Sequence, residues 1–225
     1  MSSCSEPQSK GTVLITGAAS GIGKATAELF AQRGWCCVLL DRDLERLWQL
    51  KSQLVSSNHQ KHLCRVLDLT DPAAIQSLGQ DLPELDALIN NAGMSDSGAS
   101  ALEPVDEEVP ARLMALNLAA PARMVQACTY RLRTGARIVN VASGAGLRAI
   151  PHRGLYSPSK AGLLAQTRAL AQARPTWTVT SLAPGFVKTD LVQQLIDREA
   201  AFAVRVLIDL LCFASLCCVC SCVPS

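Results

Sequence analysis

Tyr156 lies four residues before Lys160, and it is one of only two tyrosines in the chain, the other being Tyr130. A free tyrosine, with a pKa of ~10, is a poor base at neutral pH. On a helix the two side chains would lie one turn apart, and the lysine ammonium would favour the phenolate and lower the pKa of the tyrosine. The pair is therefore a candidate acid/base for proton transfer at a substrate oxygen. Packing along an amphipathic helix edge is the alternative.

Asn117 is a second candidate, because it lies in a helical stretch four residues before Pro121. Proline has no amide hydrogen, so the carbonyl of Asn117 loses its normal helix partner. We expect a kinked helix here, with a freed carbonyl that can hold a water molecule. A surface proline kink without a catalytic role is the alternative.

Short apolar runs alternate with amphipathic stretches along the chain, and this pattern predicts strands that alternate with helices. The predicted strands cover residues 12–16, 35–40, 62–69, 86–90, 136–143 and 177–183. Gly34 is expected to end the first helix, Thr70 or Asp71 to cap the third with Pro72 in its first turn, and the fourth to run from about residue 106 to 133. The order predicts a Rossmann-like, doubly wound parallel sheet with helices on both faces.

Ligands in such sheets bind beyond the carboxyl ends of the strands, and the first predicted strand ends in the glycine-rich turn TGAASGIG, residues 16–23. Glycines let a backbone approach a pyrophosphate, which the following helix N-terminus attracts. The expected contacts are Gly17, Ser20, Gly21, Ile22 and Gly23. A plain structural turn is the alternative.

Asp41 ends the second predicted strand, 18 residues after Gly23, about where an acid meets the adenosine ribose hydroxyls. A carboxylate there would repel a 2′-phosphate, which favours NAD over NADP. Arg42, next in the chain, could bind such a phosphate, and an ordinary solvated acid is the alternative for Asp41. The third and fourth strands end in small or polar residues that suit a narrow crevice for adenine and ribose, although each alone is typical of a turn or cap. These are Asp68, Asn90, Ala92 and Gly93.

Taken together, the chain resembles the single-domain form of the short-chain dehydrogenase/reductase family over about residues 10 to 195. The pieces that match, in the family's order, are TGAASGIG, Asp41, Asp68-Leu69, NNAG (90–93), Asn117, Ser143, Tyr156-x-x-x-Lys160 and Pro184-Gly185. The resemblance implies that Tyr156 is the acid/base and that Lys160 also binds the nicotinamide ribose. It implies that Ser143, at the end of the fifth strand, donates a hydrogen bond to the substrate oxygen. It further implies that the backbone at Asn117 positions a water leading to the lysine.

The same resemblance implies an NAD-dependent oxidoreductase that interconverts a secondary alcohol and a ketone, assembled as a homodimer or homotetramer. It adds cofactor contacts from Leu69, Tyr156, Lys160, Pro184, Gly185, Val187 and Thr189. Thr189 would touch the cofactor carboxamide, and the residues after Gly185 would form a lid. Pro158 and Thr180 are minor departures from the family's pattern.

The amino-acid composition argues against some classes of function. The net charge is +2 with acids and bases interspersed, and only 4% of residues are aromatic, which argues against a nucleic-acid surface. Residues 1–10 lack the apolar core of a secretory signal and are expected to be a disordered lead-in to a cytoplasmic protein. Residues 11–199 are expected to form one domain.

Residues 200–225 depart from the family, because they contain no recognisable last strand and no glycine pair. Five cysteines gather here, namely Cys212, Cys217, Cys218, Cys220 and Cys222. The favoured interpretation is an alternative or frameshifted end. The others are a membrane contact too short to span, a prenylation-like CVPS end, and metal binding without a paired ligand cluster. A catalytically inactive isoform, or a nucleotide-binding or interaction module on the same fold, therefore stands as the second functional hypothesis.

Overall fold

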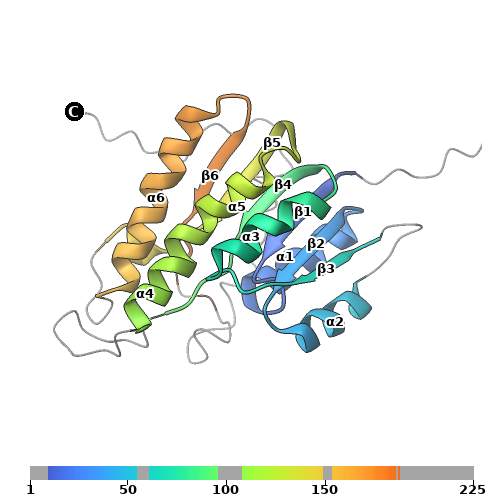
Figure 1. The fold of residues 1–225 in the computed structure, drawn as a ribbon, viewed down its shortest axis with the longest axis horizontal. Helices are drawn as coiled ribbons and strands as arrows, with labels where there is room; N and C mark the ends of the chain where they lie inside the picture. The colour runs from blue at the N-terminus through green and yellow to red at the C-terminus, as the bar shows by residue number, and fades with distance from the viewer. Residues whose placement is uncertain (1–9, 55–60, 96–107, 149–153, 186, 188–225) are drawn as a thin grey trace, which may run out of the picture.

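The computed structural model describes residues 10–54, 61–95, 108–148, 154–185 and 187. Six strands form one parallel sheet in the order β3-β2-β1-β4-β5-β6, so the predicted doubly wound sheet is confirmed (Figure 1). Their bounds are β1 (Thr12–Thr16), β2 (Cys36–Asp41), β3 (Leu63–Val66), β4 (Leu85–Asn90), β5 (Leu132–Val141) and β6 (Thr178–Leu182). The order reverses between β1 and β4, and ligands in such sheets bind beyond the strand ends at this point.

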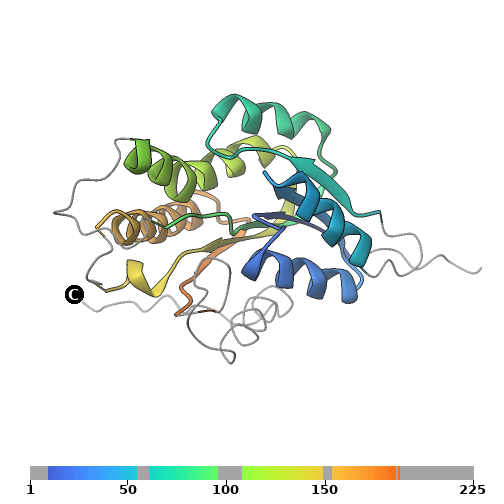
Figure 2. The same cartoon turned by 90° about the horizontal axis from the view of Figure 1, so that it is seen from below.

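Helices cover both faces of the sheet. The helices are α1 (Gly21–Gln32), α2 (Leu44–Gln53), α3 (Pro72–Leu78), α4 (Glu108–Met114), α5 (Ala120–Cys128) and α6 (Tyr156–Ala173). Because alternate strand residues point to opposite faces, Ile15 and Leu39 pack with Phe30 of α1, whereas Leu14 and Leu88 belong to the core beneath α3 and α5. Figure 2 shows α1 on one side of the sheet and α3 to α5 on the other.

Local signals set several helix ends as predicted. Gly34 follows α1 with a φ of 88°, a left-handed conformation that glycine adopts without strain. Asp71 caps α3 by accepting hydrogen bonds from the amides of Ala73 and Ala74, and Pro72 occupies the first helical position. These ends fix the loops that carry the candidate site residues.

The helical region predicted over about residues 106–133, with a kink at Asn117, is distorted in its middle but ends earlier than predicted. Between α4 and α5 lies a π-helix, Ala115–Ala119, and the distortion predicted around Asn117 takes this form. Pro121 has no N–H, so it can donate neither to Asn117 in the α register nor to Leu116 in the π register. At the far end the chain leaves α5 at Cys128, because buried Leu132 joins the sheet opposite Leu85.

Two strand ends also differ from the prediction. Strand β3 ends at Val66 instead of residue 69, because the Asp68 carboxylate accepts hydrogen bonds from the amide and hydroxyl of Thr70 and closes a turn there. Strand β5 begins at Leu132 instead of residue 136 and ends at Val141. Ser143 therefore lies two residues beyond β5 rather than at its end.

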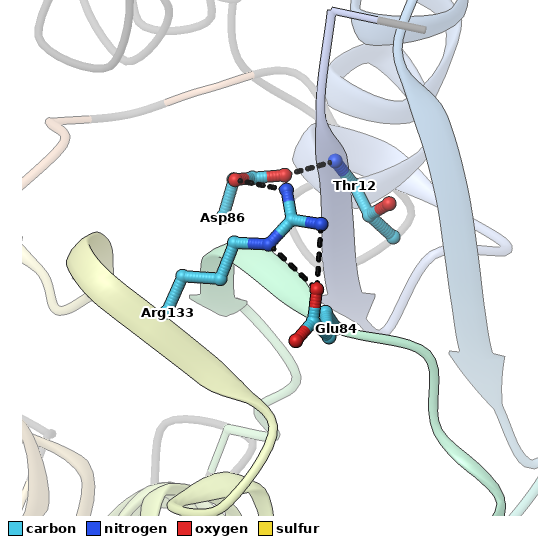
Figure 3. Close-up of polar contacts among 4 residues, drawn as sticks. All are labelled: Thr12, Glu84, Asp86 and Arg133. Atoms are coloured by element: carbon cyan, nitrogen blue, oxygen red, sulfur yellow. Dashed lines mark hydrogen bonds and ion pairs between the residues drawn. The ribbon is translucent and has the colours of Figure 1, made fainter.

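The amino ends of the central strands are joined by one arginine. Arg133 of β5 donates to Glu84 at 2.7 Å and to Asp86 at 3.0 Å, and the other carboxylate oxygen of Asp86 accepts from the Thr12 amide at 2.7 Å (Figure 3). The cluster ties β5, β4 and β1 together at the end of the sheet opposite the candidate site.

Several predictions fall on residues outside the described ranges. These are the lead-in up to residue 9, Thr189 with most of the expected lid, and the tail 200–225. Within the part of the chain that the structure describes, none of the helices has the length and apolar character needed to cross a membrane. The cytoplasmic location stays a prediction.

Candidate active site

The glycine-rich turn after β1 forms a closed cradle. Gly17 and Gly21 have φ values of 63° and 50°, which lie in the left-handed region. A Cβ on Gly23 would overlap the carbonyl oxygen of Gly17, so only glycine lets α1 start this close to the strand. Asn91, from the loop after β4, donates to the carbonyls of Thr16 at 2.9 Å and Gly17 at 3.1 Å. Asn91 therefore joins the glycine-rich turn to the end of the neighbouring strand, β4.

Asp41 stands at the carboxyl end of β2, where the sequence predicted it. Its carboxylate accepts hydrogen bonds from the amide of Ala19 at 2.9 Å and from the amide of Asp43 at 3.1 Å. The acid is therefore held beside the start of α1, whose first N–H groups and positive dipole end attract anions. Ser20 precedes this helix, and its side chain makes no capping hydrogen bond.

A cleft of about 530 Å³ opens beyond the carboxyl ends of these strands. Its lining includes eight of the predicted cofactor contacts, namely Gly17, Ser20, Asp41, Arg42, Asp68, Leu69, Ala92 and Gly93. Hydrogen bonds from Thr70, with a smaller contribution from Arg112, lower the pKa of Asp68 from its ordinary value. The volume is in the range of small-molecule and cofactor sites.

The cleft also has walls that the sequence did not predict. These residues are Leu67, Thr70, Met94, Glu108, Val109, Arg112 and Leu116. Four of them come from α4 and the π-helix, and a helical pattern cannot say which surface residues face a distant loop. Asn91 was missed as well, although it stands inside the NNAG stretch and could have been found there.

Tyr156 and Lys160 start α6, as their spacing predicted. Lys160 is only 4% exposed; its Nζ donates to the Val141 carbonyl at 2.9 Å and lies 5.8 Å from the centroid of the Tyr156 ring. Burial lowers the pKa of Lys160 from 10.5 to about 8, so the ammonium form still dominates at neutral pH. A positive charge at this distance favours the phenolate of Tyr156.

Ser143 caps the short 3-10 turn Gly144–Gly146 that follows β5. Its hydroxyl oxygen accepts from the Ala145 amide at 3.1 Å, which leaves the hydroxyl hydrogen to donate elsewhere. The Gly144 amide donates to the Pro184 carbonyl at 2.8 Å. Pro184 and the neighbouring Gly185 are therefore brought beside Ser143 from the end of β6.

Asn117 is fully buried, and its side-chain amide is hydrogen-bonded through both its oxygen and its nitrogen. Its amide exchanges two hydrogen bonds of 2.8 Å with the backbone of Met94, and its Nδ2 also donates to Ser159 Oγ at 3.1 Å. A Cβ on Gly93 would lie 3.2 Å from Asn117 Oδ1 and 3.3 Å from Lys160 Nζ. Because Gly93 also lines the cleft, the lysine ammonium stands directly behind the cleft wall.

The other predicted cofactor contacts in the described ranges are not among the residues that line this cleft, namely Gly21, Ile22, Gly23, Asn90, Tyr156, Lys160, Pro184, Gly185 and Val187. Asn90 is buried, and its amide donates to Asn140 Oδ1 at 2.9 Å, so it joins β4 to β5 instead of lining the cleft. Ile22 packs against the core beneath α1. Val187 is buried and is not among the residues that line the cleft. Gly21 lines a smaller hollow of about 240 Å³ on the far side of the turn, with Lys24 and Arg46.

Comparisons with known proteins agree with this geometry. The family model described as short chain dehydrogenase matches residues 11–200. The chain is 34% identical over 189 residues to an uncharacterized short-chain type dehydrogenase/reductase of Sinorhizobium fredii, a match that covers 81% of this chain and 34% of that relative. The chain thus spans about a third of the length of this longer protein.

Two further relatives match over most of their own length. A 3-oxoacyl-(acyl-carrier-protein) reductase of Rickettsia conorii is 34% identical over 196 residues, covering 84% of this chain and 77% of the relative. The solved short-chain dehydrogenase from Sphingobium yanoikuyae in complex with NADPH is 30% identical, with a TM-score of 0.78 over 89% of this chain and 84% of that one.

Proposed function

The chain belongs to the short-chain dehydrogenase/reductase family of oxidoreductases, and we propose that it interconverts a secondary alcohol and a ketone with NAD(H), using Tyr156 as the acid/base. The observation that carries the proposal is the position of the Lys160 ammonium, buried between the cleft wall at Gly93 and the ring of Tyr156. A small-molecule substrate would then meet the tyrosine beside the cleft wall at Gly93, behind which the Lys160 ammonium lies.

The nicotinamide supplies or accepts the hydride when the cofactor is bound, and the chain's own groups manage the proton. Tyr156 gives its phenolic proton to the carbonyl oxygen in reduction and takes the alcohol proton in oxidation. The Lys160 ammonium, 5.8 Å from the centroid of the Tyr156 ring, favours the phenolate form that takes the alcohol proton. Ser143 donates its free hydroxyl hydrogen to the same substrate oxygen and stabilises the charge that develops there.

The glycine cradle and the start of α1 support binding of a dinucleotide, because backbone amides there can face a pyrophosphate without any side chain in the way. Asp41 supports NAD(H), since its fixed carboxylate would accept from the ribose hydroxyls and repel a 2′-phosphate. Arg42 and the NADPH bound by the Sphingobium relative support NADP(H) instead. We propose NAD(H) as the preferred form because the Asp41 carboxylate is held at the glycine-rich turn by its hydrogen bond from the Ala19 amide.

Titration of the purified chain with NADH and with NADPH tests the cofactor. We expect tighter binding of NADH, and Asp41→Asn should narrow the difference by removing the charge that repels the phosphate. Tighter binding of NADPH to the unmodified chain would overturn the preference. Size-exclusion of the same samples tests the proposed homodimer or homotetramer.

Turnover tests the chemistry, on a panel of secondary alcohols, simple ketones and a 3-oxoacyl thioester of the kind named for the Rickettsia relative. Tyr156→Phe should abolish it. Tyr130→Phe is the matched control, because Tyr130 is the only other tyrosine and is 96% exposed beyond the end of α5. Binding of NADH without turnover of any substrate would favour an inactive, nucleotide-binding form of the fold.

A further inference from the structure

Helix α6, which carries Tyr156 and Lys160, receives no side-chain cap from the residue that precedes it. This residue is Leu155, whose apolar side chain cannot accept a hydrogen bond from the first N–H groups of the helix. Tyr156 is the first residue of the first turn. Helix ends fray more readily than helix interiors, so a contact from inside the protein to this turn would help to hold the backbone of the proposed acid/base.

Ser159 supplies that contact from inside the protein. Its hydroxyl donates to the Tyr156 carbonyl oxygen at 2.7 Å and accepts from Asn117 Nδ2 at 3.1 Å. The directions are fixed, because the single hydroxyl hydrogen points to a carbonyl, which can only accept. The side chain is fully buried, so water cannot replace either bond.

The chain of hydrogen bonds continues to the wall of the cofactor cleft. Asn117 uses its second Nδ2 hydrogen and its Oδ1 on the backbone of Met94, which lines the cleft. One serine hydroxyl therefore connects the first turn of α6, the π-helix and the loop after β4. Lys160 follows Ser159 directly, so the same turn sets the distance between its ammonium and the Tyr156 ring.

We propose that Ser159 is a positioning residue that holds Tyr156 in place for proton transfer by linking the start of α6 to Asn117 and the cleft wall. The inference rests on the proposed function of Tyr156. The simpler alternative is a serine that only bonds back to its own helix, as serine and threonine often do.

Ionisation of Tyr156 gives a test that needs no substrate. In a Tyr130→Phe background Tyr156 is the only tyrosine, and its pKa can be read from the absorbance of the phenolate. Ser159→Ala should raise this pKa, because the tyrosine is no longer held against Lys160. Ser159→Thr keeps the hydroxyl and should restore the original value. If the alanine variant does not fold, Ser159→Cys, which is close to serine in volume, replaces it, and the same rise in the pKa of Tyr156 is expected.

Thr167 is the matched control on the same helix. It is buried, and its hydroxyl bonds back to the Leu163 carbonyl at 2.7 Å, but it accepts from Asn140 instead of Asn117. Thr167→Ala should lower the melting temperature about as much as Ser159→Ala and leave the pKa of Tyr156 unchanged. On a substrate that the unmodified chain turns over, Ser159→Ala should lower kcat about tenfold or more with little change in NADH affinity.

The outcomes separate the two proposals. An unshifted pKa of Tyr156 in Ser159→Ala, or equal shifts in Ser159→Ala and Thr167→Ala, would overturn the role of Ser159. An absence of turnover by the unmodified chain would count against the proposed enzyme, whereas a selective pKa shift in the same protein would still support the link from Ser159 to Tyr156.

Discussion

Replacing Lys160 with methionine should make the protein more stable while it removes the proposed catalytic charge. The lysine Nζ is buried beside Gly93 and has the Val141 carbonyl as its hydrogen-bond acceptor. Burial disfavours the charged form. Methionine has a similar length and no charge, so Lys160→Met keeps the packing and removes the desolvation cost.

The size of the effect follows from the pKa. Burial lowers it from 10.5 to about 8, and each pKa unit corresponds to about 1.4 kcal/mol, so the buried ammonium costs the folded state about 3 kcal/mol. Below pH 8 both the folded and the unfolded chain carry the charge, and the cost is present in full. Between pH 8 and 10.5 the folded chain releases its proton first, so stability rises with pH until the cost is gone.

Urea unfolding from neutral to alkaline pH measures this difference. Tyr156 is a titratable group whose ring centroid lies 5.8 Å from Lys160 Nζ, so both chains should carry Tyr156→Phe. The Tyr156→Phe/Lys160→Met variant should be more stable than Tyr156→Phe at pH 7, and the gap should shrink by about 3 kcal/mol as the pH approaches 10.5. All other titrating groups are shared and cancel in the comparison.

A gap that stays constant within about 1 kcal/mol over this pH range would refute the reasoning, because about 1.4 kcal/mol is the effect of a single pKa unit. It would mean that water or a relaxed backbone solvates the ammonium and that Lys160 is an ordinary lysine. The expected result would instead make Lys160 a residue retained at a cost in stability, as active-site charges commonly are.

Further substitutions test the glycine-rich turn and the ion-pair cluster at the opposite end of the sheet. Gly23→Ala should lower NADH affinity more than about tenfold and reduce the melting temperature, because its Cβ would overlap the Gly17 carbonyl. Gly135 has open space around it but a φ of 80°. Gly135→Ala should therefore lower the free energy of unfolding by about 1 kcal/mol and leave NADH binding unchanged. Arg133→Gln should lower the urea midpoint in low salt, and by less in high salt. Asp86→Asn should lower the urea midpoint more than Glu84→Gln does, because Asp86 also accepts a hydrogen bond from the Thr12 amide. Equal effects of the two acid substitutions would contradict the arrangement in Figure 3.

The sheet and about half of the cleft were predictable, because both depend on local signals at strand ends. A strand that ends in TGAASGIG needs glycines for its turn, and Asp41 and Asp68 stand where parallel strands leave the sheet. Their meeting in one cleft follows from the parallel order alone. The sequence could not show that Val109 and Arg112 complete this cleft, since their positions depend on how α4 is oriented over the strand ends.

The role of Asn117 was only half predictable. Pro121 predicted the break in the helix, and because proline has no amide hydrogen it pointed to the Asn117 backbone carbonyl as the group without a helix partner. The side chain proved to be the group with the identifiable contacts, since it holds Met94 and Ser159. No local pattern could have paired these residues, because 42 positions separate Asn117 from Ser159 and 23 separate it from Met94.

The two least regular backbone segments of the site lie against each other. The π-helix before α5 is interrupted because Pro121 cannot donate, and α6 begins at Tyr156 behind an apolar residue that cannot cap it. Regular helix hydrogen bonds hold neither segment fully, yet both carry residues that must be placed accurately for proton transfer. The hydrogen bond from Asn117 to Ser159 joins them. Buried side-chain bonds of this kind are lost only when the packing around them opens, so we expect the accuracy of the proposed site to depend on this contact more than on the hydrogen bonds within either helix.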